Sequence, residues 1–136
     1  TKNGYAPKLF LATMGPVKQH KGRADFSRGF FEVAGFDVIY PNSLNSAEEA
    51  VDALVKSGAK AVVICSTDDT YPEIVPAFMN ELKNKANDTL TVLAGYPKEQ
   101  IDAHKEAGVN EFIYLGCDAY SLLKRVLNKT IELSTK

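Results

Sequence analysis

The stretch LFLATMGPVKQHKGRADFSRGFFEVA, residues 9–34, contains the pattern that decides the fold. A short apolar strand is predicted at 8–13, a polar loop at 14–22, and then an amphipathic helix that Gly35 ends. The buried face of this helix is predicted from apolar residues at helical spacing, Phe26, Phe30 and Ala34, with Phe31 beside them. Ligands of open α/β sheets bind outside the carboxyl ends of the strands, where the strand order reverses. The loop at 14–22, which contains His20, is therefore the first candidate for a ligand site.

Strand and helix patterns alternate along the rest of the chain. Further apolar strands are predicted at 37–40, 61–65, 89–95 and 111–114. The run at 61–65, AVVIC, is rich in β-branched residues and should be a central strand. Before it, Ser46 and Glu49 predict a capping box that starts a helix, and Gly58 ends that helix.

The third helical pattern follows the polar loop at 66–73. Thr70 and Glu73 form a second possible capping box. The buried stripe is predicted at Ile74, Phe78 and Leu82. Pro76 lies inside this pattern and predicts either a bend or a later start of the helix, because proline removes a helical hydrogen bond.

Two more helices complete the alternation. A short one between Pro97 and Gly108 carries His104 on its exposed side, and Asp118 caps the last one. The inward residues of the last helix are predicted to be Leu122, Leu123, Val126 and Leu127. Alternating apolar strands and helices imply an α/β fold with a parallel sheet and helices on both faces. We predict a flavodoxin-like (Rossmann-like) five-stranded order 2-1-3-4-5, with the loops at 14–22 and 66–71 facing its crevice.

Length, charge and composition narrow the class of protein. The 136 residues suffice for one domain, and the net charge of -1, with both signs interspersed, predicts no nucleic-acid partner. No apolar run approaches the about 20 residues of a membrane span. Cys65 and Cys117 lie far apart, outside metal-ligand spacing, and predict buried thiols in the reducing cytoplasm. The polar start predicts a linker from a larger chain at 1–7 and a single domain at 8–136.

His20 is the one obvious chemical group of the first loop. Its imidazole could ligate a metal, including the cobalt of a corrin, or transfer protons near neutral pH. A metal-ligating histidine normally has a carboxylate that orients its ring. The nearby chain instead offers Lys18 and Lys21, and the nearest acid is Asp25. A solvated surface histidine is the alternative interpretation.

Other candidate groups follow the later strands. Asp68 and Asp69 could bind a cation, or could simply stabilise the positive end of the following helix. Gly15, Gly22 and Gly95 could let a phosphate or nucleotide tail approach the backbone, although the sequence contains no glycine-rich phosphate loop. No nucleophile and base stand at a readable spacing, so no catalytic residue is assigned.

The segments LFLATMGP, GFDVIYP, AVVICSTDDTYPEIVPAFMNEL, VLAGYP and YLGCDAYSLLKRVL together resemble the cobalamin-binding domain of methylmalonyl-CoA mutase. The resemblance extends from about Lys8 to Leu127. Members that bind cobalamin carry Asp-x-His-x-x-Gly after the first strand, Ser-x-Leu after the third and Gly-Gly after the fourth. If cobalamin binds here, the resemblance implies His20 as the lower cobalt ligand, with Gly22, Ser66, Thr67 and Gly95 around the cofactor.

Each of these motifs is broken in this sequence. With His20 aligned to the histidine, Lys18 replaces the aspartate and Arg23 replaces the glycine that admits the corrin. Asp68 stands where leucine is expected, and Tyr96 replaces the second glycine of the third motif. These departures, with ATMGPVKQHKGRADF and YLGCDAY, resemble the non-catalytic small subunit of heterodimeric bacterial mutases.

This resemblance implies a domain that binds no cofactor itself and serves assembly with a large catalytic subunit. The parent enzyme would use adenosylcobalamin to interconvert methylmalonyl-CoA and succinyl-CoA. One alternative is a genuine cobalamin-binding domain that uses His20. Another is a signalling receiver of the same fold with Asp68 or Asp69 as phosphoacceptor, but the first loop lacks the acidic pair and Leu115-Gly116 stands in place of the lysine that receivers need.

Overall fold

The fold is known from a computed structural model that describes residues 8–13, 17–33, 35–40, 46–66, 70–85, 89–95, 98–113 and 119–134. Within these residues, one parallel five-stranded sheet has the order β2-β1-β3-β4-β5. Its strands are Lys8–Thr13 (β1), Asp37–Ile39 (β2), Ala61–Cys65 (β3), Leu90–Ala94 (β4) and Glu111–Ile113 (β5). The predicted flavodoxin-like order is confirmed.

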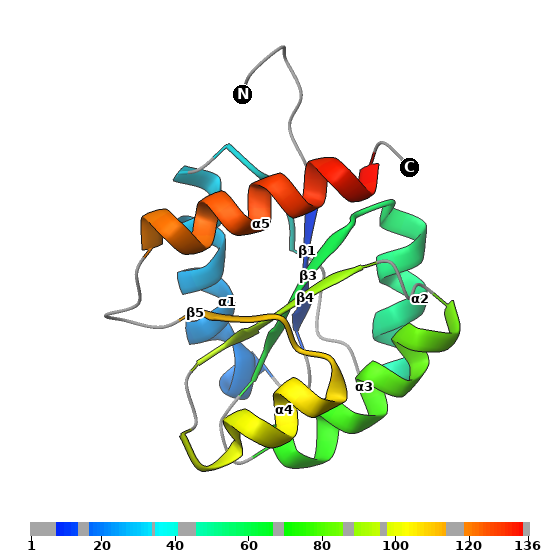
Figure 1. Ribbon diagram of the computed structural model, residues 1–136. Coiled ribbons are helices and arrows are strands. Elements are labelled where there is room, and N and C mark those ends of the chain that lie inside the picture. The colour runs from blue at the N-terminus through cyan, green and yellow to red at the C-terminus, as the bar shows by residue number, and fades with distance from the viewer. Residues whose placement is uncertain are drawn as a thin grey trace.

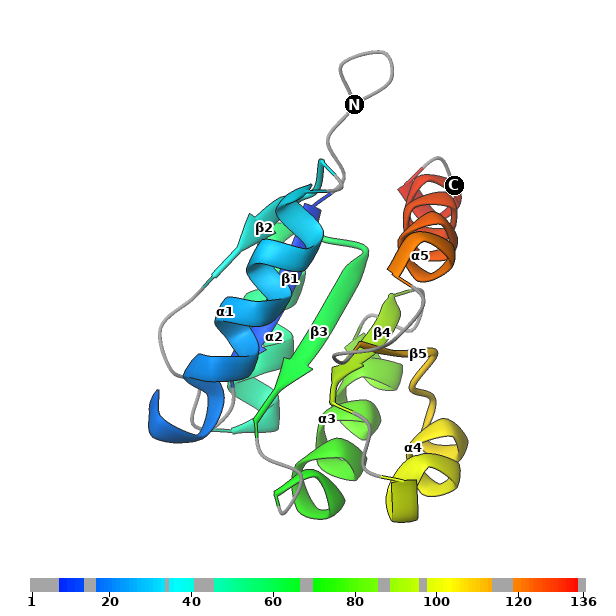
Figure 2. The ribbon, with the colours of Figure 1, turned by 90° about the vertical axis from the view of Figure 1, so that its left-hand side faces the viewer.

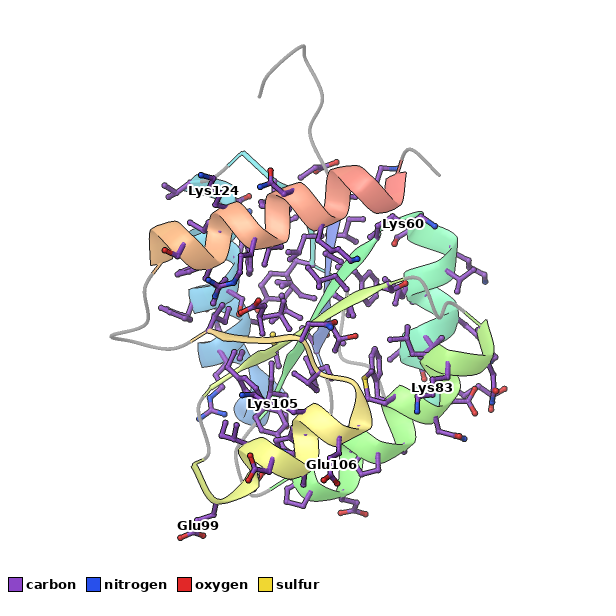
Figure 3. The ribbon with its side chains drawn as sticks, in the orientation of Figure 1. Lys60, Lys83, Glu99, Lys105, Glu106 and Lys124 are labelled. Atoms are coloured by element: carbon purple, nitrogen blue, oxygen red, sulfur yellow. The ribbon has the colours of Figure 1, made fainter. Side chains whose placement is uncertain are left out.

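Helices cover both faces of the sheet (Figures 1 and 2). The helices are Val17–Val33 (α1), Ala47–Ser57 (α2), Tyr71–Lys85 (α3), Ile101–Ala107 (α4) and Ala119–Ser134 (α5), and a 3₁₀ turn, Lys98–Gln100 (η2), precedes α4. Helices α1 and α5 pack on one face, and α2, α3 and α4 pack on the other. Exposed charges such as Lys83, Glu106 and Lys124 stand on the helices around this core (Figure 3).

Side chains that alternate along the central strands fill the two cores. Val62 and Ile64 of β3 point into the core beneath α2 and α3, whereas Val63 and Cys65 point into the core beneath α1 and α5. All of β3 is buried, and the strand pairs with β1 and β4. Burial on both faces explains the unbroken apolar sequence of this strand.

The predicted helix caps of α2 and α4 are observed. The Ser46 hydroxyl accepts a hydrogen bond from the Glu49 backbone N–H at 3.1 Å. Gly58 ends α2 with φ of 76°, and Gly108 ends α4 with φ of 117°. Both glycines adopt the left-handed conformation that other residues avoid.

Helix α1 begins earlier than predicted. Residues 17–22, expected in a loop, form the first part of α1, so His20 and Gly22 belong to a helix. Pro16 directly precedes the helix, and proline is common at helix starts. Lysine, glutamine and arginine propagate helices well, and one glycine is tolerated.

The buried faces of α1 and α3 also differ from the prediction. In α1 the fully buried residues are Ala24, Ser27 and Phe31, whereas Phe26 and Phe30 are half-buried. In α3 the buried residues are Tyr71, Val75, Phe78, Met79 and Leu82, whereas Ile74 is half-buried. Helix α3 begins at Tyr71 and continues through Pro76, so the alternative prediction that this helix starts later is wrong.

Several predicted features lie outside the described residues. They include the linker at 1–7, the loop at 14–16, Ala34, Thr67, Asp68, Asp69, Tyr96, Leu115, Gly116, Cys117 and Asp118. In the last helix Leu122 and Val126 are buried and Leu123 is half-buried, as predicted, and the Leu127 side chain lies outside the described part. Among the helices that the structure describes, none has both the length and the apolar character needed to cross a membrane.

Candidate functional site at the carboxyl edge of the sheet

Arg23 of α1 reaches over the carboxyl edge of the sheet. Its Nη1 atom donates hydrogen bonds to the carbonyl oxygens of Ser66, 3.1 Å away, and Ala94, 3.2 Å away. Ser66 directly follows β3, and Ala94 is the last residue of β4. The Nη1 group carries two hydrogens, so it can donate one to each carbonyl. A single guanidinium thereby ties α1 to the ends of two neighbouring strands.

Tyr71 of α3 approaches the same edge from the opposite face of the sheet. Its hydroxyl lies 2.6 Å from the Ala94 carbonyl oxygen and accepts a hydrogen bond from the Ser66 backbone N–H at 3.1 Å. The side chain is completely buried, and burial raises the pKa of the phenol far above its usual range. The hydroxyl therefore remains a neutral donor.

Arg23 and Tyr71 also contact one another directly. The guanidinium carbon lies 5.6 Å from the centroid of the Tyr71 ring, within cation–π range. Ala94 thus accepts from both side chains, which uses both lone pairs of its carbonyl oxygen. We call Arg23, Tyr71, Ser66 and Ala94 the edge cluster.

Polar side chains around Ser66 extend this cluster. The Thr70 hydroxyl donates to the Ser66 hydroxyl at 2.8 Å. On the α1 side, the Ser27 hydroxyl donates to the Arg23 backbone carbonyl at 2.7 Å and lies 3.8 Å from the Cys65 sulfur. Because a helical serine bonding back to its own helix leaves that hydroxyl engaged, it is not available as a free nucleophile.

Cys65 is an inert thiol in this structure. It is fully buried at the end of β3, and burial raises its pKa to about 12. A thiol with such a pKa carries almost no thiolate at neutral pH, and the thiolate is the reactive form. The prediction that the Cys65 thiol is buried is confirmed.

His104 is buried, which contradicts the prediction that it is exposed. Only 3% of the residue is exposed, and its ring packs edge-on against Tyr71 with centroids 6.1 Å apart. Its Nε2 atom lies 2.8 Å from the Gln100 side-chain oxygen. Helix α4 presents this histidine to the core beneath α3, while Lys105 and Glu106 are exposed. The exposed, charged neighbours of His104 in the sequence led to the wrong prediction that the histidine is exposed as well.

The predicted cofactor residues are only partly brought together. Ser66 is buried in the edge cluster. Gly95 follows β4 with φ of 130°, and its N–H donates to the Ile113 carbonyl at 2.7 Å. Gly22 is exposed on α1. His20 lies in the first part of α1, with its side chain outside the described part, and Thr67 lies outside it entirely.

Sequence reasoning identified Arg23 only as a replaced glycine and missed Tyr71 altogether. The signal for Tyr71 was an aromatic residue at a helix start, a few positions after the end of a central strand. Such a residue can place its ring in the core and its hydroxyl at the strand ends.

The outer surface of α1 carries a second charged group of side chains. Lys21 and Asp25 form an ion pair of 2.7 Å, and the Tyr40 hydroxyl donates to the other Asp25 oxygen at 3.1 Å. The hydrogen bond from Lys21, followed by that from Tyr40, holds the pKa of Asp25 below its usual range. Asp25 is thus engaged with Lys21 and Tyr40.

What this edge can do chemically follows from its groups. Within the described residues, no three histidine, cysteine or acidic side chains come together as metal ligands. The edge cluster presents donors and acceptors that already bond to one another, with no activated nucleophile among them. It is suited to holding two helices and two strands in place.

The fold and this edge define a flavodoxin-like α/β domain, a class that includes cobalamin-binding proteins and signal receivers. A cobalamin-binding protein from Desulfitobacterium hafniense has TM-score 0.70 and 16% identity, over 93% of this chain and 60% of that one. A CheY-like protein from Pseudomonas aeruginosa has TM-score 0.68 and 21% identity, over 93% of this chain and 94% of that one. These likenesses concern the fold, and no family model matches the sequence.

In sequence, the chain is related to the methylmalonyl-CoA mutase small subunit. It is 32% identical to the small subunit of Porphyromonas gingivalis over 94% of this chain and 20% of that protein. It is also 32% identical to that of Streptomyces virginiae, over 93% of this chain and 19% of that protein. The chain therefore spans about a fifth of the length of these relatives. The predicted resemblance to the small subunit is confirmed.

Proposed function

We propose that this chain is the C-terminal, cobalamin-binding-like domain of a methylmalonyl-CoA mutase small subunit in the cytoplasm, with residues 8–136 as the domain and 1–7 as a linker. The observation that carries the proposal is the 32% identity to two small subunits over more than nine-tenths of this chain. The domain would serve assembly of a heterodimer with the large catalytic subunit, whose adenosylcobalamin supports exchange between methylmalonyl-CoA and succinyl-CoA.

We further propose that the domain itself holds no cobalamin. Arg23 stands where the resemblance requires a glycine, and its guanidinium is engaged with the ends of β3 and β4. A corrin approaching this edge would have to displace that side chain and leave the Ser66 carbonyl oxygen without this donor. Losing a partner for a buried polar group costs about 1–3 kcal/mol, so displacement alone would weaken binding roughly 5- to 150-fold.

The position of His20 supports the same proposal. It belongs to helix α1, whereas the resemblance places the ligand histidine in a loop after the first strand. The carboxylate of Asp25, the nearest acid in sequence, is engaged with Lys21 and Tyr40. A metal-bound histidine without an orienting acceptor loses about 10- to 100-fold in metal affinity.

Titration with hydroxocobalamin tests the cofactor part of the proposal. We expect no saturable change in the visible spectrum at micromolar concentrations of this chain. The matched pair of variants is His20→Ala and His104→Ala, since the second removes a histidine that is buried in the other core. A saturable shift that His20→Ala abolishes and His104→Ala retains would instead favour the genuine cobalamin-binding alternative.

Sedimentation of the full small subunit with and without the large subunit tests the assembly part. We expect a one-to-one complex with the large subunit. An active, self-sufficient homodimer of the small subunit would contradict the proposed role. The receiver alternative has less support, because the related sequences are mutase small subunits and the receivers share only the fold.

A further inference from the structure

The groups that surround the Arg23 guanidinium in the edge cluster are also groups that could bind a separate ligand. Two carbonyl oxygens at the ends of neighbouring parallel strands face one planar donor group, and an aromatic ring lies beside that group. Guanidinium combines in-plane N–H donors with a flat, weakly hydrated surface that stacks on aromatic rings. The hydrogen bonds from Arg23 to Ser66 and Ala94 use the first property, and its contact with the Tyr71 ring uses the second.

We propose that the carbonyl oxygens of Ser66 and Ala94, with the ring of Tyr71, form a guanidinium-binding site that Arg23 fills from within the chain. The site is a property of the sheet and α3, and α1 supplies the bound group. Its occupant class is therefore a planar cation such as guanidinium or methylguanidinium, admitted when the Arg23 side chain is removed. The inference goes beyond the proposed function, because it holds whether or not the domain belongs to a mutase or binds cobalamin.

The receptor side of this site is well fixed. The Tyr71 hydroxyl is 2.6 Å from the Ala94 carbonyl oxygen and accepts from the Ser66 backbone N–H, so the ring and both strand ends are bonded to one another without Arg23. The ring is also packed against buried His104 on the side of α4. Removing the arginine side chain therefore leaves the acceptors and the ring still connected through Tyr71.

Arg28 provides a matched comparison on the same helix. Its guanidinium lies 5.9 Å from the centroid of the Tyr40 ring and 3.4 Å from Glu32, so it also combines an aromatic ring with an oxygen acceptor. The Arg28 side chain is more than half exposed, and its oxygen acceptor is the solvent-exposed carboxylate of Glu32 instead of two strand-end carbonyls. A free cation should bind detectably after removal of Arg23 and not after removal of Arg28.

Chemical rescue tests the proposal. Arg23→Ala and Arg28→Ala are unfolded with urea in methylguanidinium chloride up to 50 mM, with sodium chloride at equal ionic strength as reference. We expect the unfolding constant of Arg23→Ala to fall saturably, by about elevenfold at ten times the dissociation constant. Arg28→Ala reports the weak denaturing effect of the salt, which acts on both variants alike.

Amide spectra locate the bound cation. In Arg23→Ala we expect methylguanidinium to shift the backbone resonances of Ser66, Tyr71 and Gly95 with the same saturation constant as the rescue. If Arg23→Ala does not fold alone, recovery of folded protein from urea is compared with and without methylguanidinium, and selective recovery supports the proposal. An equal response of the two variants, equal recovery in sodium chloride, or shifts centred elsewhere would overturn it.

Discussion

Arg23 and Tyr71 meet over the carboxyl edge of the sheet although their helices lie on opposite faces of it. The guanidinium carbon of Arg23 is 5.6 Å from the centroid of the Tyr71 ring, and both side chains bond to the Ala94 carbonyl oxygen. The two helix layers are thereby joined at the end of the sheet where this fold class binds ligands.

Tyr71→Phe should lower the free energy of unfolding by about 1–3 kcal/mol. The variant keeps the ring but leaves the Ser66 N–H without its acceptor and removes the donor closest to the Ala94 carbonyl. Tyr40→Phe is the control, because its hydroxyl bonds to exposed Asp25 and should cost less than about 0.5 kcal/mol. Urea unfolding at neutral pH measures both. Equal losses of unfolding free energy in the two variants would show that the buried Tyr71 hydroxyl stabilises the fold no more than the Tyr40 hydroxyl does.

Glycines inside α1 give the second prediction. Gly22 and Gly29 lie in the helix, and a Cβ added at either would meet no heavy atom within 4 Å. Gly22→Ala and Gly29→Ala should therefore each raise the free energy of unfolding by about 0.5–1 kcal/mol, because alanine loses less conformational entropy in a helix. Gly58→Ala should lower it, since Gly58 has φ of 76°. A loss of stability in Gly22→Ala would mean that the start of α1 is not helical in solution.

The strand order could be predicted because short patterns that alternate along the chain leave few right-handed topologies. The start of α1 could not, because residues 17–22 are polar and a loop and an exposed helical turn look alike in composition. The burial of His104 depends on where α4 packs, which the local sequence IDAHKEA does not determine. The Arg23–Tyr71 contact joins residues distant in the sequence and from separate layers, so no periodicity could reveal it.

Pro76 supplies the third prediction. It lies inside α3 with its side chain exposed, and without an N–H it cannot bond to the carbonyl of Pro72 one turn earlier. Pro76→Ala should raise the free energy of unfolding by about 1–2 kcal/mol, because the restored helical bond outweighs the greater freedom of the unfolded chain. Pro72→Ala is the matched control, since an N–H in the first turn has no helical partner. Gains of equal size in both would contradict this explanation.

The last prediction concerns alkaline pH and Cys65. Burial raises the pKa of its thiol from 9.0 to about 12 in the folded chain. Above pH 9 the unfolded chain loses this proton while the folded chain keeps it, so the unfolded state binds fewer protons and stability falls as pH rises. Between these two pKa values, the free energy of unfolding should fall by roughly 1.4 kcal/mol per pH unit. Tyr71, whose pKa is also raised, adds to the loss above its ordinary value of 10.0.

Cys65→Ala separates the cysteine contribution from that of Tyr71. Cys65→Ala also removes the packing contacts of the sulfur atom, and this loss of stability is the same at every pH. The slope of the unfolding free energy against pH is therefore compared, and not its value at a single pH. Between pH 9 and 10, where Tyr71 contributes little, urea unfolding should give a distinctly shallower slope for Cys65→Ala than for the parent chain. Parallel slopes would mean that the thiolate of Cys65 is tolerated in the folded state. Such tolerance would require the two influences that lower this pKa, the hydrogen bond with Ser27 and then the charge of the Arg23 guanidinium, to outweigh burial.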